Sequence, residues 1–140
     1  MKYTLQQIIG TMLWWTEGTK AYRDKRRENG WIYPVDLTNT NPEIIKIFLE
    51  FLRKDIGINE SRLKLQLQIH QGDNQKNLES YWSKITKIPE NRFTKTIVRP
   101  RGKKIGKTKG TCKVRYSDMN TYQKLNNLLK NILTLLTKNS

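Results

Sequence analysis

Apolar residues recur at helical spacing in several stretches of the chain, and this pattern predicts helices. The first runs from Leu5 to Glu17, and Gly18 is suitably placed to end it. The second begins at the run Asn41-Pro42-Glu43, because Asn is a favoured N-cap residue and Pro fits the first helical position. The third spans Asn77 to Thr86 and stops before Pro89. A final helix carries its inner apolar stripe at Tyr122, Leu125, Leu129, Ile132 and Leu136.

Alternation of apolar and polar residues predicts strands between these helices. From Ser61 to His70 the two kinds alternate, so this strand should have one buried and one polar face. The same alternation predicts a last strand from Cys112 to Tyr116. The Asn-Gly pair at 29–30 is a strong hairpin signal between a basic segment, 20–26, and the run from Trp31 to Asn39.

The predicted elements follow the order α-β-β-α-β-α-β-α. A short segment from Phe93 to Val98 leads from the third helix into a basic, Gly-rich loop from Pro100 to Gly110, which is expected to be flexible. We expect one α+β domain covering residues 1–140. Its four-stranded antiparallel sheet should have helices on one face and an open, polar second face.

The charge of the chain is concentrated in two segments. Lys and Arg number 27 against 12 Asp and Glu, which gives a net charge of +15. No acidic residue occurs between Asn91 and Ser117, and a second basic cluster, 20–27, follows the first helix. A solvated face normally mixes both signs, so these clusters indicate a polyanionic partner, with nucleic acid as the default. Neither cluster lies on a helix with an opposing apolar face, which argues against a membrane surface.

The open sheet face is therefore predicted to bind double-stranded DNA. Amide and cationic side chains on neighbouring strands could reach base edges and phosphates in a major groove. The alternative is a polar face that only contacts water. The predicted DNA-binding residues are Lys20, Tyr22, Arg23, Lys25, Arg26, Lys64, Gln66, Gln68, His70, Arg99, Arg101, Lys103, Lys104, Lys107, Lys109, Lys113 and Arg115.

Other classes of function have less support in the sequence. No stretch is apolar for long enough to cross a bilayer and no signal-peptide pattern occurs, so an intracellular protein of the cytoplasm, nucleoid or an organelle is expected. RNA binding fits the charge, but RNP-like aromatic strands and a GxxG clamp are missing, and core packing is expected to explain the tryptophans. His70 is the only histidine and Cys112 the only cysteine, so a nucleophile and base pair is not indicated. Cys112 is expected to pack as a small apolar residue in a strand.

The stretch from Gly10 to Gly18, GTMLWWTEG, is apolar on nearly every side of its predicted helix. Such a helix needs two partners. One interpretation packs one side on the core of its own subunit and the other side, with Gly10, Thr11 and Trp14, on a second subunit, which predicts a homodimer. The alternative is a central helix buried within one subunit.

Glu17 stands in the last turn of this helix, where the negative end of the helix dipole disfavours a carboxylate. A compensating charge is therefore expected. It could be Lys20, in a surface pair that the residues alone favour, or a divalent metal such as Mg²⁺ held by oxygen ligands.

A helix ending in Glu-Gly, then two strands, a helix, more strand and a C-terminal helix, in a small basic chain, resembles the LAGLIDADG homing endonuclease family. Residues 10–18 align with its nine-residue signature without gaps, and the order of elements matches over nearly the whole chain. The segments Trp-Trp-Thr-Glu-Gly and Thr38-Asn39-Thr40-Asn41-Pro42-Glu43 resemble a divergent prokaryotic branch. In this family two signature helices pack together and bring their terminal acids to the scissile phosphates.

The resemblance implies a site-specific DNA endonuclease of a mobile element or intron. It would act as a homodimer on a roughly palindromic target and use a divalent metal such as Mg²⁺ to hydrolyse each strand. Glu17 matches the metal-binding acid, and the metal site is assigned to Glu17 and Gly18. Asn39 matches the polar residue that organises water, and Lys113 the lysine that offsets charge. A turn-capping Asn39 and a phosphate-contacting Lys113 are the alternatives.

The signature departs from the family pattern at four residues. Trp15 replaces its first acid, and Glu17 stands where Asp is commoner. Met12 and Thr16 occupy positions where small residues usually let the two helices approach closely, so Met12 could hold the two Glu17 carboxylates apart. The alternative function is therefore a DNA-binding protein of the same fold that does not cut, acting as a regulator or an intron-splicing cofactor.

Overall fold

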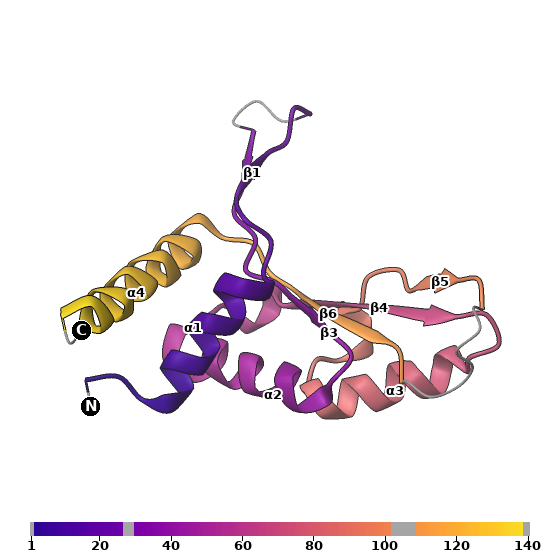
Figure 1. Ribbon diagram of the computed structural model, residues 1–140. Coiled ribbons are helices and arrows are strands. Elements are labelled where there is room, and N and C mark those ends of the chain that lie inside the picture. The colour runs from indigo at the N-terminus through magenta and orange to yellow at the C-terminus, as the bar shows by residue number, and fades with distance from the viewer. Residues whose placement is uncertain (1, 27–29, 102–108, 139–140) are drawn as a thin grey trace.

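The computed structural model describes residues 2–26, 30–101 and 109–138, and its mixture of helices and strands confirms the α+β class (Figure 1). The helices are α1 (Leu5–Glu17), α2 (Pro42–Glu50), α3 (Gln75–Thr86) and α4 (Met119–Lys138). The strands are β1 (Tyr22–Arg23), β2 (Trp31–Ile32), β3 (Leu37–Asn39), β4 (Lys64–His70), β5 (Ile97–Arg99) and β6 (Thr111–Arg115).

Local sequence signals explain where the helices begin and end. The predicted bounds of α1 are confirmed, and Asn41 caps α2 by accepting a hydrogen bond from the Glu43 amide at 2.9 Å. Helix α3 begins two residues earlier than predicted, because the side chain of Asn74 accepts from the Asn77 amide and caps it. Beyond α2 the chain continues as a π-helix, Phe51–Ile56, which ends at a glycine with positive φ.

The main sheet has the strand order β3-β6-β4-β5. The pairs β3–β6 and β4–β6 are antiparallel, as predicted, but β4 and β5 are parallel, so the prediction of a purely antiparallel sheet is wrong. The reason is the connection between β4 and β5. Helix α3 carries the chain back along β4, and a crossover through a helix joins parallel neighbours.

The predicted hairpin forms, but it lies outside the main sheet. Strands β1 and β2 form a two-stranded sheet of their own, and we call this hairpin, residues 20–26 and 30–33, the arm. The run from Trp31 to Asn39 is not one strand, because Pro34 lacks an N–H group and interrupts the ladder between β2 and β3. In Figure 1 the arm rises from the sheet on the side away from α2 and α3.

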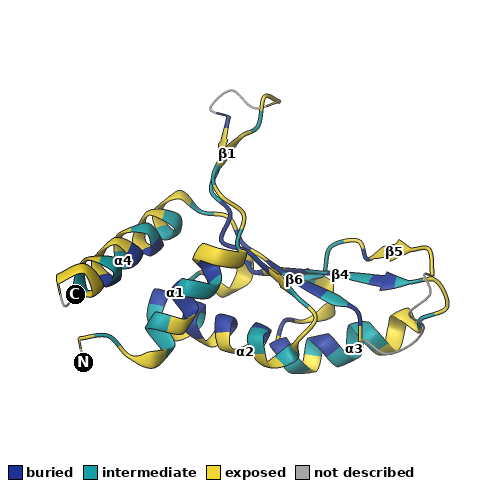
Figure 2. Ribbon diagram, in the orientation of Figure 1, coloured by how far each residue is buried: buried dark blue, intermediate teal, exposed yellow. Residues whose placement is uncertain are grey.

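The sheet buries one face and leaves the other open, as Figure 2 shows. The alternation predicted for β4 is confirmed, since Leu63, Leu65, Leu67 and Ile69 are at most 1% exposed and pack under the helices. Cys112 lies in the same core, and burial raises the pKa of its thiol, so it behaves as the apolar strand residue that the sequence predicted.

Helix α1 packs against its own subunit with the residues that were assigned to a dimer interface. Gly10 and Thr11 are buried and Trp14 is 2% exposed. A Cβ atom on Gly10 would overlap the ring of Phe51, so this glycine allows α1 to pack closely on the π-helix. The assignment of Gly10, Thr11 and Trp14 to a dimer interface is therefore corrected, because a helix apolar on all sides does not indicate which side faces the core.

The opposite side of α1 is apolar and unburied. Leu5 is 68% and Ile9 43% exposed, and the exposed Thr16 continues this side of the helix, whereas Met12 is partly buried and packs against the core. No helix among the described residues is long and apolar enough to cross a membrane.

Candidate nucleic-acid interface

The open sheet face carries rows of polar and cationic side chains set by the strand register. Lys113 on β6 lies between Thr38 on β3 and Gln66 on β4. Because residues paired across strands project from the same face, all three point away from the helices. The further pairs on this face are Lys64 with Arg115, Gln68 with Thr111, and His70 with Arg99.

Two of these side chains are held by the segment that precedes β5. The amide nitrogen of Gln66 donates to the carbonyl of Lys95 at 3.0 Å, and the guanidinium of Arg115 donates to the hydroxyl of Thr94 at 3.3 Å. These bonds fix both groups while leaving the Gln66 amide oxygen and most of the Arg115 donors for a ligand. Gln68 and His70 lie on the same strand, so the predicted row of polar residues on β4 is present.

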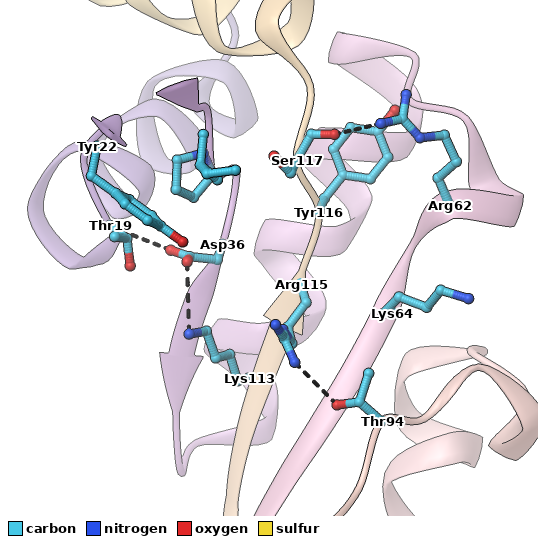
Figure 3. Close-up of a pocket in the computed structure, with 12 residues that line it drawn as sticks. Thr19, Tyr22, Asp36, Arg62, Lys64, Thr94, Lys113, Arg115, Tyr116 and Ser117 are labelled. Atoms are coloured by element: carbon cyan, nitrogen blue, oxygen red, sulfur yellow. Dashed lines mark hydrogen bonds and ion pairs between the residues drawn. The ribbon is translucent and has the colours of Figure 1, made fainter. Parts of the chain in front are cut away.

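A hollow of about 360 Å³ lies where this face meets the end of α1 and the base of the arm (Figure 3). Four of the residues that line it are basic and one is acidic, which makes it a cationic hollow suited to phosphate. The basic residues are Arg62, Lys64, Lys113 and Arg115. Arg62 is positioned by the Ser117 carbonyl at 2.6 Å and lies over the ring of Tyr116.

The acidic residue is Asp36, which the sequence analysis did not select. It is 7% exposed, and its carboxylate accepts a hydrogen bond from the Thr19 amide at 2.7 Å and lies 3.9 Å from the Lys113 ammonium. A buried carboxylate requires partners of this kind. The available signal was an Asp within the apolar run Pro-Val-Asp-Leu that enters a strand.

Glu17 ends α1 two residues before Thr19, and its side chain is exposed. The ammonium of Lys20 donates to the carbonyl of Trp15 and lies 5.6 Å from the Trp14 ring. Lys20 therefore neutralises the end of the helix through a backbone carbonyl, and the expected Glu17–Lys20 pair does not form. Among the described residues no hydrogen bond or ion pair engages the Glu17 carboxylate.

Gly18 brings the end of α1 against the start of β3. Its N–H donates to the Trp14 carbonyl at 2.9 Å, and a Cβ atom would lie 2.5 Å from that oxygen and 3.0 Å from the Asp36 carbonyl oxygen. A larger residue would push the two elements apart. The Gly18 contact and the Thr19–Asp36 bond together place the turn that carries Glu17 beside Asp36 and Lys113.

Asn39 does not belong to this group. It pairs with Cys112, whose side chain is in the core, so Asn39 lies on the helix-covered face of the sheet. Its side-chain oxygen accepts from the Asn41 amide at 2.8 Å. The structure therefore places Asn39 in the alternative role, as a turn-capping residue, and Asp36, immediately before β3, is the residue at the hollow.

The remaining predicted DNA-binding residues fall into three groups. Tyr22, Arg23, Lys25 and Arg26 lie on the arm, where Asp24 raises the pKa of Arg26 by a hydrogen bond. Arg101 lies 3.9 Å from Asp73 after β5, and Lys109 lies over the Tyr81 ring before β6. Lys103, Lys104 and Lys107 lie outside the described residues, as does most of the loop for which flexibility was expected.

The predicted metal site can be compared with the donors present. Within the described ranges, no three His, Cys, Asp or Glu side chains gather at one place. Glu17 and Asp36 offer the carboxylate oxygens that Mg²⁺ prefers, although Lys113 already faces Asp36. The donor chemistry fits Mg²⁺, and further oxygens from a phosphate or a second subunit would be required.

The tryptophans differ from the sequence expectation. Trp14 and Trp82 are buried in the core, but Trp15 is 40% and Trp31 54% exposed, so core packing explains only two of the four.

Comparisons with known proteins identify no relative. No family model matches the chain, and neither a curated protein nor a solved structure matches it.

Proposed function

We propose that this protein is a DNA endonuclease of the LAGLIDADG type. It binds double-stranded DNA on the open sheet face and, as a homodimer, hydrolyses both strands of a roughly palindromic site with a divalent metal. One observation carries the proposal: the exposed Glu17 carboxylate ends a helix that Gly18 and Asp36 hold beside a cationic hollow, at the edge of an open polar sheet face.

The open face supports DNA rather than another polyanion as the ligand. Gln66 and Gln68 alternate with Lys64 on one strand, and Lys113 and Arg115 lie directly beside them. Glutamine can bind adenine through two hydrogen bonds, while lysine and arginine contact phosphates or guanine. A surface that only neutralised charge would have no need of neighbouring amides.

The exposed stripe of α1 supports a homodimer through residues other than those first assigned. The exposed side chains of Leu5 and Ile9 leave an apolar strip along the signature helix, and a two-fold axis beside it would bring two copies of Glu17 toward one another. Replacing Ile9 by Asp should therefore give monomers in sedimentation velocity. Leu136→Asp, at a more exposed apolar position on α4 (64% against 43% for Ile9), is the control and should leave the dimer intact.

In this proposal each side chain at the hollow has a distinct task. Glu17 from each subunit binds the metal, which when bound activates water and stabilises the leaving oxygen. Lys113 offsets the charge of the scissile phosphate, and Asp36 holds Lys113 and the Thr19 turn in place. Arg62, Lys64 and Arg115 orient the neighbouring phosphates.

A second function is favoured by a specific observation. Lys113 faces Asp36, and the described part of one subunit gathers too few carboxylates to hold a metal without help. A protein of the same fold that binds a specific DNA sequence without cutting, as a regulator or splicing cofactor, would show this arrangement.

The two functions are separated by incubating a randomised duplex library with Mg²⁺ and sequencing both cut and retained DNA. We expect discrete cuts from the native protein and from Glu43→Gln, a control at an exposed acid of α2, but none from Glu17→Gln. Retained DNA with a shared motif and no cuts from any variant would support the binder. DNA retained without any shared motif would contradict both.

A further inference from the structure

The arm presents two different faces, which its register defines. Tyr22 pairs with Ile32, and both line the hollow. Arg23 pairs with Trp31, and paired residues project from the same side of a hairpin. The face with Arg23 and Trp31 therefore points away from the hollow.

Trp31 is an exposed aromatic without an explanation in the fold. It is 54% exposed, whereas Trp82 of α3 is fully buried and donates its ring N–H to the Lys109 carbonyl at 2.7 Å. A large aromatic left in water at the side of a projecting hairpin is typical of a contact residue, because its burial by a ligand is favourable.

The charge of the arm identifies the kind of ligand. The arm holds four basic residues and one acidic residue, and the Asp24 carboxylate accepts three hydrogen bonds from Arg26. The basic arm of a second copy would be repelled, whereas a polyanion would be attracted. A duplex resting on the open face meets this arm, because the arm rises on that side of the sheet (Figure 1). An arm that projects beside a bound duplex can reach into one of its grooves.

We propose that the arm enters a groove of the duplex beside the hollow and that Trp31 inserts there as an apolar wedge against a base step, bending the DNA. This inference rests on the proposed DNA binding and adds a recognition mode to it. Apolar side chains that enter a groove partly unstack a step and kink the duplex, and steps that unstack easily are then preferred. Arg23, across the hairpin from Trp31, would contact the adjoining phosphate.

The test uses a short duplex enriched from a random pool by the wild-type protein, with a dye at each end. Energy transfer between the dyes should rise on binding, which reports bending. Trp31→Ala should lose this rise and weaken binding at least about fivefold, as loss of one aromatic–base stack does. Trp31→Phe should keep most of the rise in energy transfer and most of the affinity. Leu136→Ala, which removes an exposed apolar side chain from α4, should change neither the energy transfer nor the affinity.

The failures of the two proposals can be distinguished. A Trp31→Ala protein that binds and bends the duplex like the wild type would overturn the role of the arm and leave DNA binding intact. If the wild-type protein bound the duplex without bending it, the role of the arm would also be overturned and DNA binding would stand. A wild-type protein that enriches no duplex would refute the DNA-binding proposal itself. Because Trp31 is exposed, thermal melting of the variant should match the wild type, which separates a lost contact from a lost fold.

Discussion

Replacing Asp36 by Ala removes a carboxylate that joins the turn after α1 to β6. The substitution loses the hydrogen bond from the Thr19 amide and the charge pair with Lys113. A hydrogen bond to a charged group contributes about 1.5–3 kcal/mol. The Lys113 pair adds less, about 0.2–1 kcal/mol, because the lysine side chain is 37% exposed and solvent screens it. We therefore expect Asp36→Ala to lower the free energy of unfolding by about 2–4 kcal/mol.

Asp36→Asn separates the two contributions. Its amide oxygen can still accept from the Thr19 amide, so only the charge pair is lost and stability should fall by about 1 kcal/mol or less. For a chain of this length about 1 kcal/mol corresponds to roughly 3 °C in melting temperature. Calorimetry of both variants, together with Lys113→Met and the double variant, gives the coupling energy between the two side chains.

The two Asp36 variants should change DNA binding in the opposite direction to stability. Removing a negative charge from a hollow that faces phosphates should tighten binding at low salt, and cleavage should fall because Lys113 is no longer held. The reasoning would be refuted if Asp36→Ala unfolded within about 0.5 kcal/mol of the wild type, the range of an ordinary surface substitution. A zero coupling energy with Lys113 would refute the pair itself.

Three further predictions follow from the contacts described. Gly10→Ala should destabilise the protein by about 1–3 kcal/mol in urea unfolding, because the new Cβ meets the Phe51 ring; an unchanged midpoint would contradict the packing of α1. Asp118 caps α4 by accepting from the Thr121 hydroxyl and amide, which hold its pKa below the ordinary value. The stabilisation by the Asp118 carboxylate is therefore full above its unfolded pKa and is lost as pH falls through the lower folded pKa. We expect Asp118→Ala to lower the free energy of unfolding by about 1 kcal/mol at neutral pH and by less below about pH 4. An equal loss of stability at acid and neutral pH would be inconsistent with this. Replacing Lys64 and Arg115 together by Ala should weaken binding at every DNA sequence and lower the slope of log affinity against log salt by about 2, so an unchanged slope would show that neither residue contacts phosphate.

Periodicity predicted the parts of the fold that short-range physics determines. The sequence correctly predicted the bounds of α1, the Asn41 cap and the alternation of β4, because each depends on residues close together in sequence. The parallel pairing of β5 with β4 could not be predicted, because it depends on the position at which the chain leaves α3. The segment before β5 also lacks alternation of apolar and polar residues.

The sequence selected some residues near the hollow and missed one that lines it. Lys113 was selected and lines the hollow, and Glu17 was selected and ends α1 two residues before the Thr19 amide that Asp36 binds. Asp36 was missed because it stands among apolar residues in the sequence. Its partners, Thr19 after α1 and Lys113 on β6, are distant in sequence and are identified only in the folded structure. Trp31 was assigned to the core because a tryptophan at a strand start usually packs there, and only the separation of the arm from the main sheet reveals its exposure.

The central claim is that two Glu17 carboxylates, one from each subunit, each cut one DNA strand. The most direct measurement is cleavage by a mixed dimer, purified through two different tags, in which one subunit is native and the other carries Glu17→Gln. With Mg²⁺ and a duplex enriched by the native protein, the native dimer should cut both strands, the mixed dimer should nick only one, and the variant dimer should cut neither. Cutting of both strands by the variant dimer, or by the mixed dimer at the native rate, would contradict the account.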